Sequence, residues 1–373
     1  MSEKENRIRF QGRLARGLAA VAWSVWGLAL LACNSSDARR GSAEAQARVE
    51  REMKAMISAQ LLEWERASRD LADAAPLPAD RGWSASEDAE AIERMKQAWH
   101  RAREAYELIE GAIAPTFPES DAATDARYDD FLQQIGPVGD RTPFDDQGVV
   151  GMHAIERILW ADSTPPVVIA FERGLPGYQP AYMPRTAQEA AAFKTRLAER
   201  LVRDIQALRR QFEPLVLDVA FAFQGLIDLA AEQAEKVDRA STGQEESRYA
   251  RSTMRDLRAN RRGCQAAYAI FRPWVLSKPG GEALDREVLA AFERLERAYA
   301  AVPGDAIPEP PRGWSGVSPK PEHADTPFGR LFHLVRKESD ELADDSLSGR
   351  LYAIAEHLGL RDVVARRPAP EVP

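Results

Sequence analysis

The chain has 373 residues, of which 45% are hydrophobic and 29% are charged, as is usual for a globular protein. This length allows one large domain or two small ones. The net charge of −8 argues against nucleic acid as a partner, because general nucleic-acid-binding proteins carry a basic surface.

The N-terminus predicts an export signal. A basic start is followed by an apolar run from Leu18 to Ala32, which is shorter than the roughly 20 residues of a membrane span but fits the core of a signal peptide. The run ends in Leu-Leu-Ala-Cys, which resembles the cleavage and lipidation site of bacterial lipoproteins. We therefore expect residues 1–33 to be a lipoprotein signal peptide with lipidated Cys33. An ordinary secretory signal and an uncleaved anchor are the alternatives.

Residues 34–43 are mostly small or polar, and we expect them to be a flexible tether. The second of the two cysteines, Cys264, has no disulfide partner if Cys33 is lipidated, so we expect it to be a small buried hydrophobe. The lipid would hold the mature protein on a membrane, in the periplasm or at the cell surface.

The mature chain predicts helices almost throughout. Apolar residues recur at helical spacing, and Ser84 and Thr186 each begin a capping box. Pro214 should bend or break the longest stretch, and a short strand is an option at 167–171. The expected helices cover about 44–74, 84–114, 120–134, 151–160, 186–240, 245–271, 282–301, 327–343 and 346–359. This pattern predicts an all-α fold of antiparallel bundles.

Residues 151–160, Gly-Met-His-Ala-Ile-Glu-Arg-Ile-Leu-Trp, carry the strongest chemical signal. His153 and Glu156 lie three residues apart, so on a helix they share one face and can point at the same metal ion. The alternative is structural: the imidazole and the carboxylate hydrogen-bond to each other or to a neighbouring helix.

The string Gly-x-His-x-x-Glu ending in Leu-Trp resembles the signature of the imelysin family. Residues 106–127 and 243–260 are similar, in matching order, to the acidic segment and the later Glu-Glu segment of the imelysin-like domain in EfeO-type periplasmic iron-uptake lipoproteins. One departure is Tyr249-Ala250-Arg251-Ser252-Thr253, where that branch has Tyr-Ser-His-Thr-Asp.

The resemblance implies two packed helical bundles, within a domain covering 44–365. The expected bundles are about 44–162 and about 186–362. It also implies a metal cleft near the His-x-x-Glu helix. Carried over residue by residue, the implied metal ligands are His153, Glu156, Glu107, Glu110, Asp125 and Glu246, with Glu245 as the alternative to Glu246.

One imidazole with several carboxylates suits iron, and also zinc, copper or manganese, because no thiolate is available. Carboxylates clustered without a cation would raise one another's pKa values. A second feature is the arginine series Arg248, Arg251, Arg255, Arg258 and Arg262, which would form one stripe along a helix. It is either an anion-binding face or a solvated, ion-paired one.

The sequence thus leads to a lipid-anchored periplasmic metal-binding protein, in iron uptake, with an iron permease or a haem peroxidase as partner. We favour a binding protein over an enzyme. An imelysin-type metallopeptidase is the enzymatic alternative, although the compact His-Glu-x-x-His zinc motif is missing from the sequence. A helical adaptor that binds a protein or an envelope polymer, without metal, is the third hypothesis.

Overall fold

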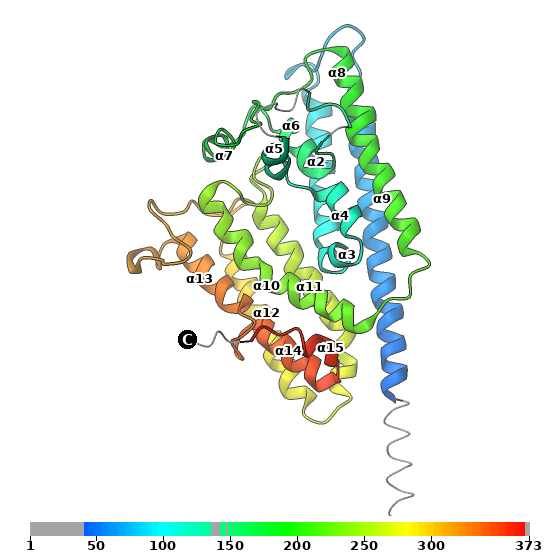
Figure 1. The fold of residues 1–373 in the computed structure, drawn as a ribbon, viewed down its shortest axis with the longest axis vertical. Helices are drawn as coiled ribbons and strands as arrows, with labels where there is room; N and C mark the ends of the chain where they lie inside the picture. The colour runs from blue at the N-terminus through cyan, green and yellow to red at the C-terminus, as the bar shows by residue number, and fades with distance from the viewer. Residues whose placement is uncertain (1–40, 136–141, 147, 370–373) are drawn as a thin grey trace, which may run out of the picture. The chain divides into compact units, whose positions relative to one another are not determined.

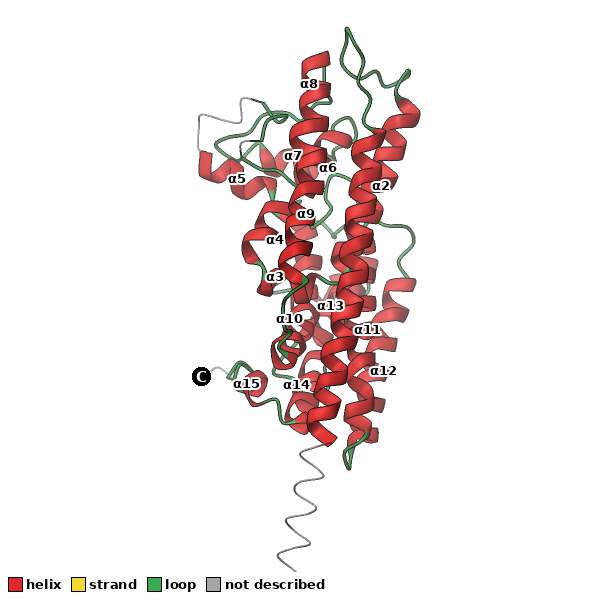
Figure 2. Cartoon of the chain, turned by 90° about the vertical axis from the view of Figure 1, so that its right-hand side faces the viewer, coloured by secondary structure: helices red, strands yellow, loops and turns green. Residues whose placement is uncertain are grey.

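The computed structural model describes residues 41–135, 142–146 and 148–369. Helices make up 67% of the structure, and no strand occurs in these residues, so the predicted all-α fold is confirmed (Figure 2). The predicted signal peptide, Cys33 and most of the predicted tether lie outside the described residues. No helix within the described ranges combines the length and apolar character that a membrane span needs.

The chain divides into two compact units, residues 1–51 and 52–373. In the first unit, the described residues 41–51 are helical, and in the second unit residues 52–74 are helical. The α-helices that follow in the second unit are labelled in Figure 1. Three short segments between them are a π-helix, η2, and two 3-10 helices, η3 and η4. Their bounds are α2 (Ala89–Glu107), α3 (Glu110–Thr116), α4 (Pro118–Asp125), α5 (Tyr128–Ile135), α6 (Met152–Leu159), α7 (Pro166–Glu172), α8 (Ala187–Ala192), η2 (Phe193–Ala198), α9 (Glu199–Phe212), α10 (Val219–Asp238), η3 (Arg239–Thr242), α11 (Thr253–Leu276), α12 (Gly281–Ala300), η4 (Pro321–His323), α13 (Pro327–Ser339), α14 (Leu347–Leu358) and α15 (Arg361–Val364).

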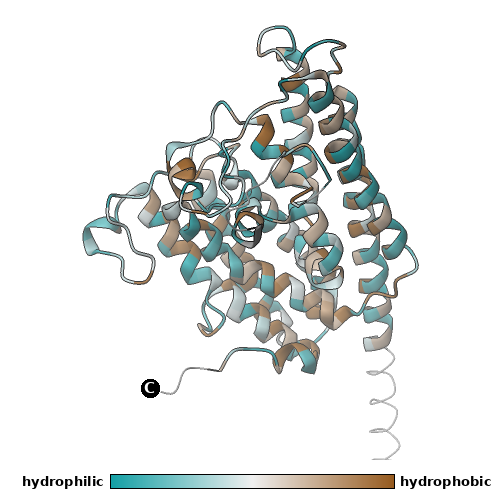
Figure 3. Ribbon diagram, turned by 45° about the horizontal axis from the view of Figure 1, so that its top comes forward, coloured by the Kyte–Doolittle hydropathy of each residue, from teal (hydrophilic) through white to brown (hydrophobic). Residues whose placement is uncertain are grey.

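Long helices pack side by side to form the core of the second unit. Helix α11 packs against α2, α10 and α12, while α10 also contacts α3 and α13. Hydrophilic and hydrophobic residues alternate along these helices (Figure 3), as expected for helices that turn one face to a core. Trp64, Trp99 and Trp274 are buried in that core, as is Cys264, which confirms its predicted role as a small buried hydrophobe.

Several predicted helix boundaries are confirmed. Thr186 and Glu189 form the predicted capping box ahead of α8. The break predicted at Pro214 separates α9 from α10. Helices α12 and α14 lie within one residue of their predicted bounds at both ends. Helix α13 begins at its predicted residue and ends four residues early. The division into a bundle at 44–162 and another at 186–362 stays a prediction.

The optional strand at 167–171 is wrong, because these residues form α7. Pro166 occupies the first turn of this helix, where its missing N–H needs no partner and its fixed φ favours helix entry. A short apolar run such as Val-Val-Ile-Ala-Phe fits a buried strand and a helix equally well by periodicity.

Two predicted helices are each divided in two. The helix expected at 84–114 starts only at Ala89. Residues 85–87 form a turn instead, and the Ser84 N–H donates to the Asp88 carboxylate across it. It ends at Glu107, and α3 resumes at Glu110. The helix expected at 120–134 is divided into α4 and α5.

The helix predicted from Glu245 instead begins at Thr253 and includes Pro273. Residues 243–252 form a loop of turns, which we call the 243–252 loop. The arginine stripe is therefore shorter than predicted: Arg255, Arg258 and Arg262 lie on α11, whereas Arg248 and Arg251 precede it. Arg248 is buried and pairs with Asp129, and Arg251 pairs with Glu309.

Candidate metal centre

Helix α6 carries His153 and Glu156 in its first turns, and both side chains are buried. The helix begins directly after Gly151, whose φ of 94° and ψ of −161° lie in a region that is essentially restricted to glycine. A Cβ at Gly151 would lie 2.4 Å from the Thr124 carbonyl oxygen. This close approach sets the start of α6 against the end of α4, and so places His153 beside Asp125.

The third element of the centre is the 243–252 loop, which carries Glu246. Glu156 holds this loop, since its Oε1 accepts hydrogen bonds from the backbone N–H groups of Tyr249 and Ala250, both at 2.9 Å. The Tyr249 hydroxyl also donates to Glu172 of α7. The loop conformation is therefore fixed by contacts with α6 and α7, which explains why no helix forms at residue 245.

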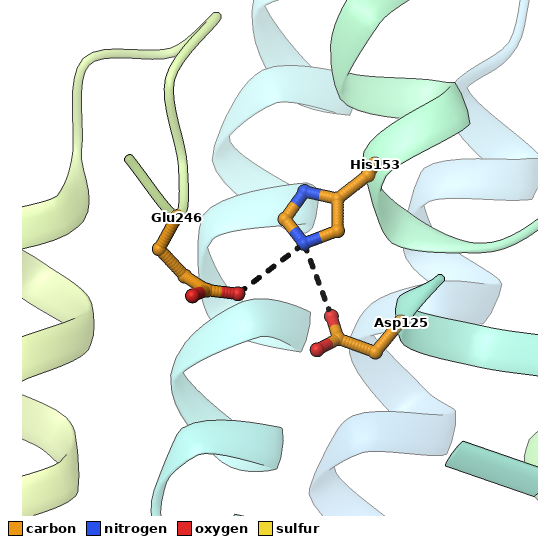
Figure 4. A group of neighbouring side chains, drawn as sticks. All are labelled: Asp125, His153 and Glu246. Carbon is orange, nitrogen blue, oxygen red and sulfur yellow. Dashed lines mark ion pairs between the residues drawn. The ribbon is translucent and has the colours of Figure 1, made fainter. Parts of the chain in front are cut away.

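The imidazole of His153 points between two carboxylates (Figure 4). Its Nε2 lies 3.4 Å from Asp125 Oδ1 and 3.5 Å from Glu246 Oε1, and makes no hydrogen bond among the described residues. One ligand atom from each of the three residues lies within 4.8 Å of the others. Ligands about 2.1 Å from an ion at tetrahedral angles are roughly 3.4 Å apart, so these distances fit a bound metal.

The other ring nitrogen of His153 contacts Glu156, with Nδ1 and Oε2 3.0 Å apart. Metal-binding histidines commonly donate this second N–H to a carboxylate, which fixes the tautomer and the orientation of the ring. Both oxygens of Glu156 are thus engaged, one with His153 and one with the loop. In this arrangement Glu156 orients the imidazole and faces away from the Nε2 atom.

Charge at the centre is strongly perturbed. Burial opposes ionisation of Asp125, but Arg103 and His153 outweigh it and lower the pKa of Asp125. Burial likewise opposes ionisation of Glu246, yet Lys236, His153 and Arg103 hold its pKa well below the usual value. Burial alone would lower the pKa of His153, whereas Asp125, Glu156 and Glu246 raise it well above its usual value. The carboxylates are ionised and face a site that favours positive charge.

Glu107 and Glu110 are predicted ligands that lie in a neighbouring cluster. Glu107 Oε2 and Glu110 Oε2 are 3.4 and 2.8 Å from Lys236 Nζ. The amide of Asn260 donates to the same two oxygens, at 2.6 and 3.0 Å. An ammonium group and an amide thus occupy these carboxylates. Their role as metal ligands stays a prediction, as does that of Glu156.

Sequence reasoning did not find Arg103, which joins the two clusters. It forms ion pairs with Glu107, Asp125, Glu246 and, at 3.7 Å, Asp256. The available signal was an arginine between Trp99 and Tyr106 on the apolar face of α2, four residues before a glutamate. Glu245, the alternative to Glu246, lies outside the three-residue group, and burial raises its pKa to about 7.

The fold and the site define a class: an all-α bundle protein with a buried cluster of one imidazole and two carboxylates. The model of the imelysin family matches residues 58–324, so the chain belongs to the imelysin family.

Curated relatives include proteins named "Iron uptake system component EfeO" from Escherichia coli (strain K12) and from Shigella flexneri. Each is 27% identical to this chain over 209 residues, which is 56% of this chain and 44% of the relative. The matched region thus covers less than half the length of these relatives.

Proposed function

We propose that this protein binds a metal ion, iron in particular, at Asp125, His153 and Glu246, as a component of iron uptake in the periplasm or at the cell surface. The observation that carries this proposal is the buried Nε2 of His153, which faces two ionised carboxylates and has no hydrogen-bond partner in the described residues. Nε2 thus has two long ion-pair contacts in place of a hydrogen bond, and a cation between the three side chains would be bound closely by all of them.

An excess of buried acid around the site supports the same proposal. Burial, with neighbouring carboxylates, raises the pKa of Asp121 to about 7, of Glu232 to about 8 and of Asp256 to about 6. It also raises that of Glu107 well above the usual value. The region therefore carries more carboxyl groups than Arg103, Lys236 and His153 neutralise, and a multivalent cation would offset the difference.

The donor set also limits the chemistry. Two carboxylates and one imidazole suit iron, with zinc, copper and manganese as alternatives. The ion would be cargo, captured and released. Because both oxygens of Glu156 are already engaged, this residue is poorly placed to act as the general base of a peptidase. The geometry therefore favours binding over the metallopeptidase alternative.

The cellular part of the proposal rests on sequence and similarity. The relatives matched above are named as iron-uptake components. Lipidation at Cys33 would anchor the protein to a membrane, and an iron permease or a haem peroxidase would be its partner.

The direct test is a metal titration of the protein by calorimetry, with Fe³⁺ supplied as its citrate complex and with Zn²⁺, Cu²⁺ and Mn²⁺. His153→Ala and Asp125→Asn should abolish or severely weaken binding. Glu156→Gln should retain the stoichiometry but weaken binding about 10–100-fold, because it only orients the ring. His333→Ala, which changes an exposed histidine, is the matched control and should leave binding unchanged.

Glu110→Gln separates this ligand set from the one implied by the sequence. We expect it to leave the stoichiometry unchanged, because Glu110 pairs with Lys236. Binding lost to the same degree as in Asp125→Asn would make Glu110 a ligand. Unaltered binding in both His153→Ala and Asp125→Asn would refute the proposed site.

A further inference from the structure

Arg103 lies at the centre of the buried charge cluster, with 1% of its side chain exposed. Its Nη1 pairs with Asp125 Oδ1, and its Nη2 lies 2.8 Å from Glu246 Oε1. These are the same two oxygens that lie 3.4 and 3.5 Å from His153 Nε2. One guanidinium thus holds both carboxylates of the proposed metal site.

We infer that Arg103 is a built-in competitor of the metal ion, which must withdraw from Asp125 and Glu246 before the ion can bind them. This inference rests on the proposed function and adds its means of regulation. An ion seated between Nε2 and the two oxygens would lie beside the positive guanidinium. In a buried site such repulsion is little screened by solvent or salt. The metal ion and the guanidinium therefore cannot both bind these two oxygens closely.

The structure also provides a place for the withdrawn side chain. The other two partners of Arg103 are Glu107 and Asp256, which belong to the long helices α2 and α11. Arg103 Nη2 already pairs with Glu107 Oε1, whereas Arg103 Nε lies 3.7 Å from Asp256 Oδ1. Within the described residues, Arg103 Nε and Asp256 Oδ2 form no hydrogen bond. A small movement of the guanidinium away from His153 can therefore keep the pair with Glu107 and form a hydrogen bond to Asp256, without exposing the charge to solvent.

The four partners of Arg103 thus fall into two pairs. Asp125 and Glu246, at the end of α4 and in the 243–252 loop, face His153 and would pass to the ion. Glu107 and Asp256 would keep the arginine. In the metal-free protein Arg103 stabilises the acidic centre as a cation would. In the loaded protein its displacement lowers the affinity, which favours release of the cargo.

The test compares Arg103→Met with the unchanged chain in calorimetric titrations with Zn²⁺ and with Fe³⁺ citrate. Without the competing charge, the affinity should rise tenfold or more. Arg262→Met, which changes an exposed arginine on the outer side of α11, is the matched control and should bind as the unchanged chain does.

If Arg103→Met does not fold, Arg103→Lys takes its place in the titration. A single ammonium keeps the charge but cannot hold both carboxylates through a planar fork, so the affinity should rise by a smaller factor. Equal or weaker binding in the variants that fold would overturn the inference and make Arg103 a residue that positions the ligands. If the unchanged chain binds none of these ions, the proposed function itself fails, which is a separate outcome.

Discussion

The inner and outer faces of the α2–α11 pair carry the same kinds of side chain in opposite surroundings. Arg103 and Asp256 face the buried cluster, while their sequence neighbours Glu104 and Arg255 line a surface pocket with Arg262. Arg103 and Asp256 have side chains 1% and 2% exposed, whereas Glu104, Arg255 and Arg262 are 32%, 35% and 47% exposed. A shift of one residue along a helix thus separates a buried charge network from a solvated one.

The difference in burial decides what each network can do. Ion pairs exposed to water contribute about 0–1 kcal/mol, because solvent screens them and the side chains lose entropy. Removing one partner of a buried pair costs about 3–5 kcal/mol, because a desolvated charge is left uncompensated. Chemistry that depends on shifted pKa values and on atoms without hydrogen bonds therefore belongs to the inner face. The arginines of the outer face form a solvated, ion-paired surface.

The two faces should differ most in how much they contribute to the stability of the metal-free protein. Arg103→Met should lower the free energy of unfolding by about 3–5 kcal/mol, because four acidic partners lose their shared cation. Urea denaturation in the presence of a chelator measures this loss. A loss below about 1 kcal/mol would mean that the inner network stabilises the protein no more than surface ion pairs do.

The next largest effect is expected for Gly151→Ala, which would shift His153 without altering any charge. Gly151→Ala would put a Cβ 2.4 Å from the Thr124 carbonyl oxygen and would force alanine into a glycine-only region. We expect a loss of at least about 2 kcal/mol in stability, together with weaker metal binding as His153 shifts away from Asp125.

Gly304→Ala is the matched control for Gly151→Ala. Gly304 has a φ of 72°, but a Cβ there would meet nothing within 4 Å. This variant should show a backbone effect of about 1 kcal/mol and normal metal binding. Equal effects at the two glycines would mean that the contact between α4 and α6 does not position the site.

The pH dependence of stability is the third test, and its sign follows from the raised pKa values. Burial raises the pKa of Asp256, Asp121, Glu245 and Glu232 to between about 6 and 8 in the folded protein. Between pH 6 and 8 the folded state therefore holds more protons than the unfolded state, so stability falls as pH rises. His153 acts in the same direction, since the stability from its raised pKa is lost as pH rises above about 6.5.

We therefore expect the metal-free protein to be more stable at pH 6 than at pH 8, by about 1 kcal/mol or more. Urea midpoints at the two pH values measure the difference. Bound metal should reduce it, because the ion favours ionised carboxylates and neutral imidazole. A higher midpoint at pH 8 without metal would show that the buried acids are not the dominant titrating groups.

The smallest effect is expected on the outer face. Arg262 Nη2 lies 2.6 Å from Glu104 Oε1, but both side chains are partly solvated. Arg262→Ala should change the free energy of unfolding by less than about 1 kcal/mol, and the difference should shrink further in high salt. A loss comparable to that of Arg103→Met would remove the contrast between the two faces.

Part of the site could be predicted because it is local. Helical periodicity alone sets His153 and Glu156 on one face of α6, and their contact at 3.0 Å agrees with that prediction. Asp125 and Glu246 were named through the order of three similar segments. Periodicity could not bring them together, because they belong to α4 and to the 243–252 loop, and the loop was itself predicted to be helical.

An all-α chain of the imelysin family, with an imidazole and a carboxylate on one helix face, could be predicted from the amino-acid sequence, because these features depend on neighbours in the chain. Three features needed the packed structure: which acids face His153 Nε2, the pairing of Glu107 and Glu110 with Lys236, and the burial of Arg103 among four carboxylates. The physical reason is that burial and long-range packing set the charge environment. The close contact at Gly151 and the hydrogen bonds of Glu156 fix that packing between segments far apart in the chain.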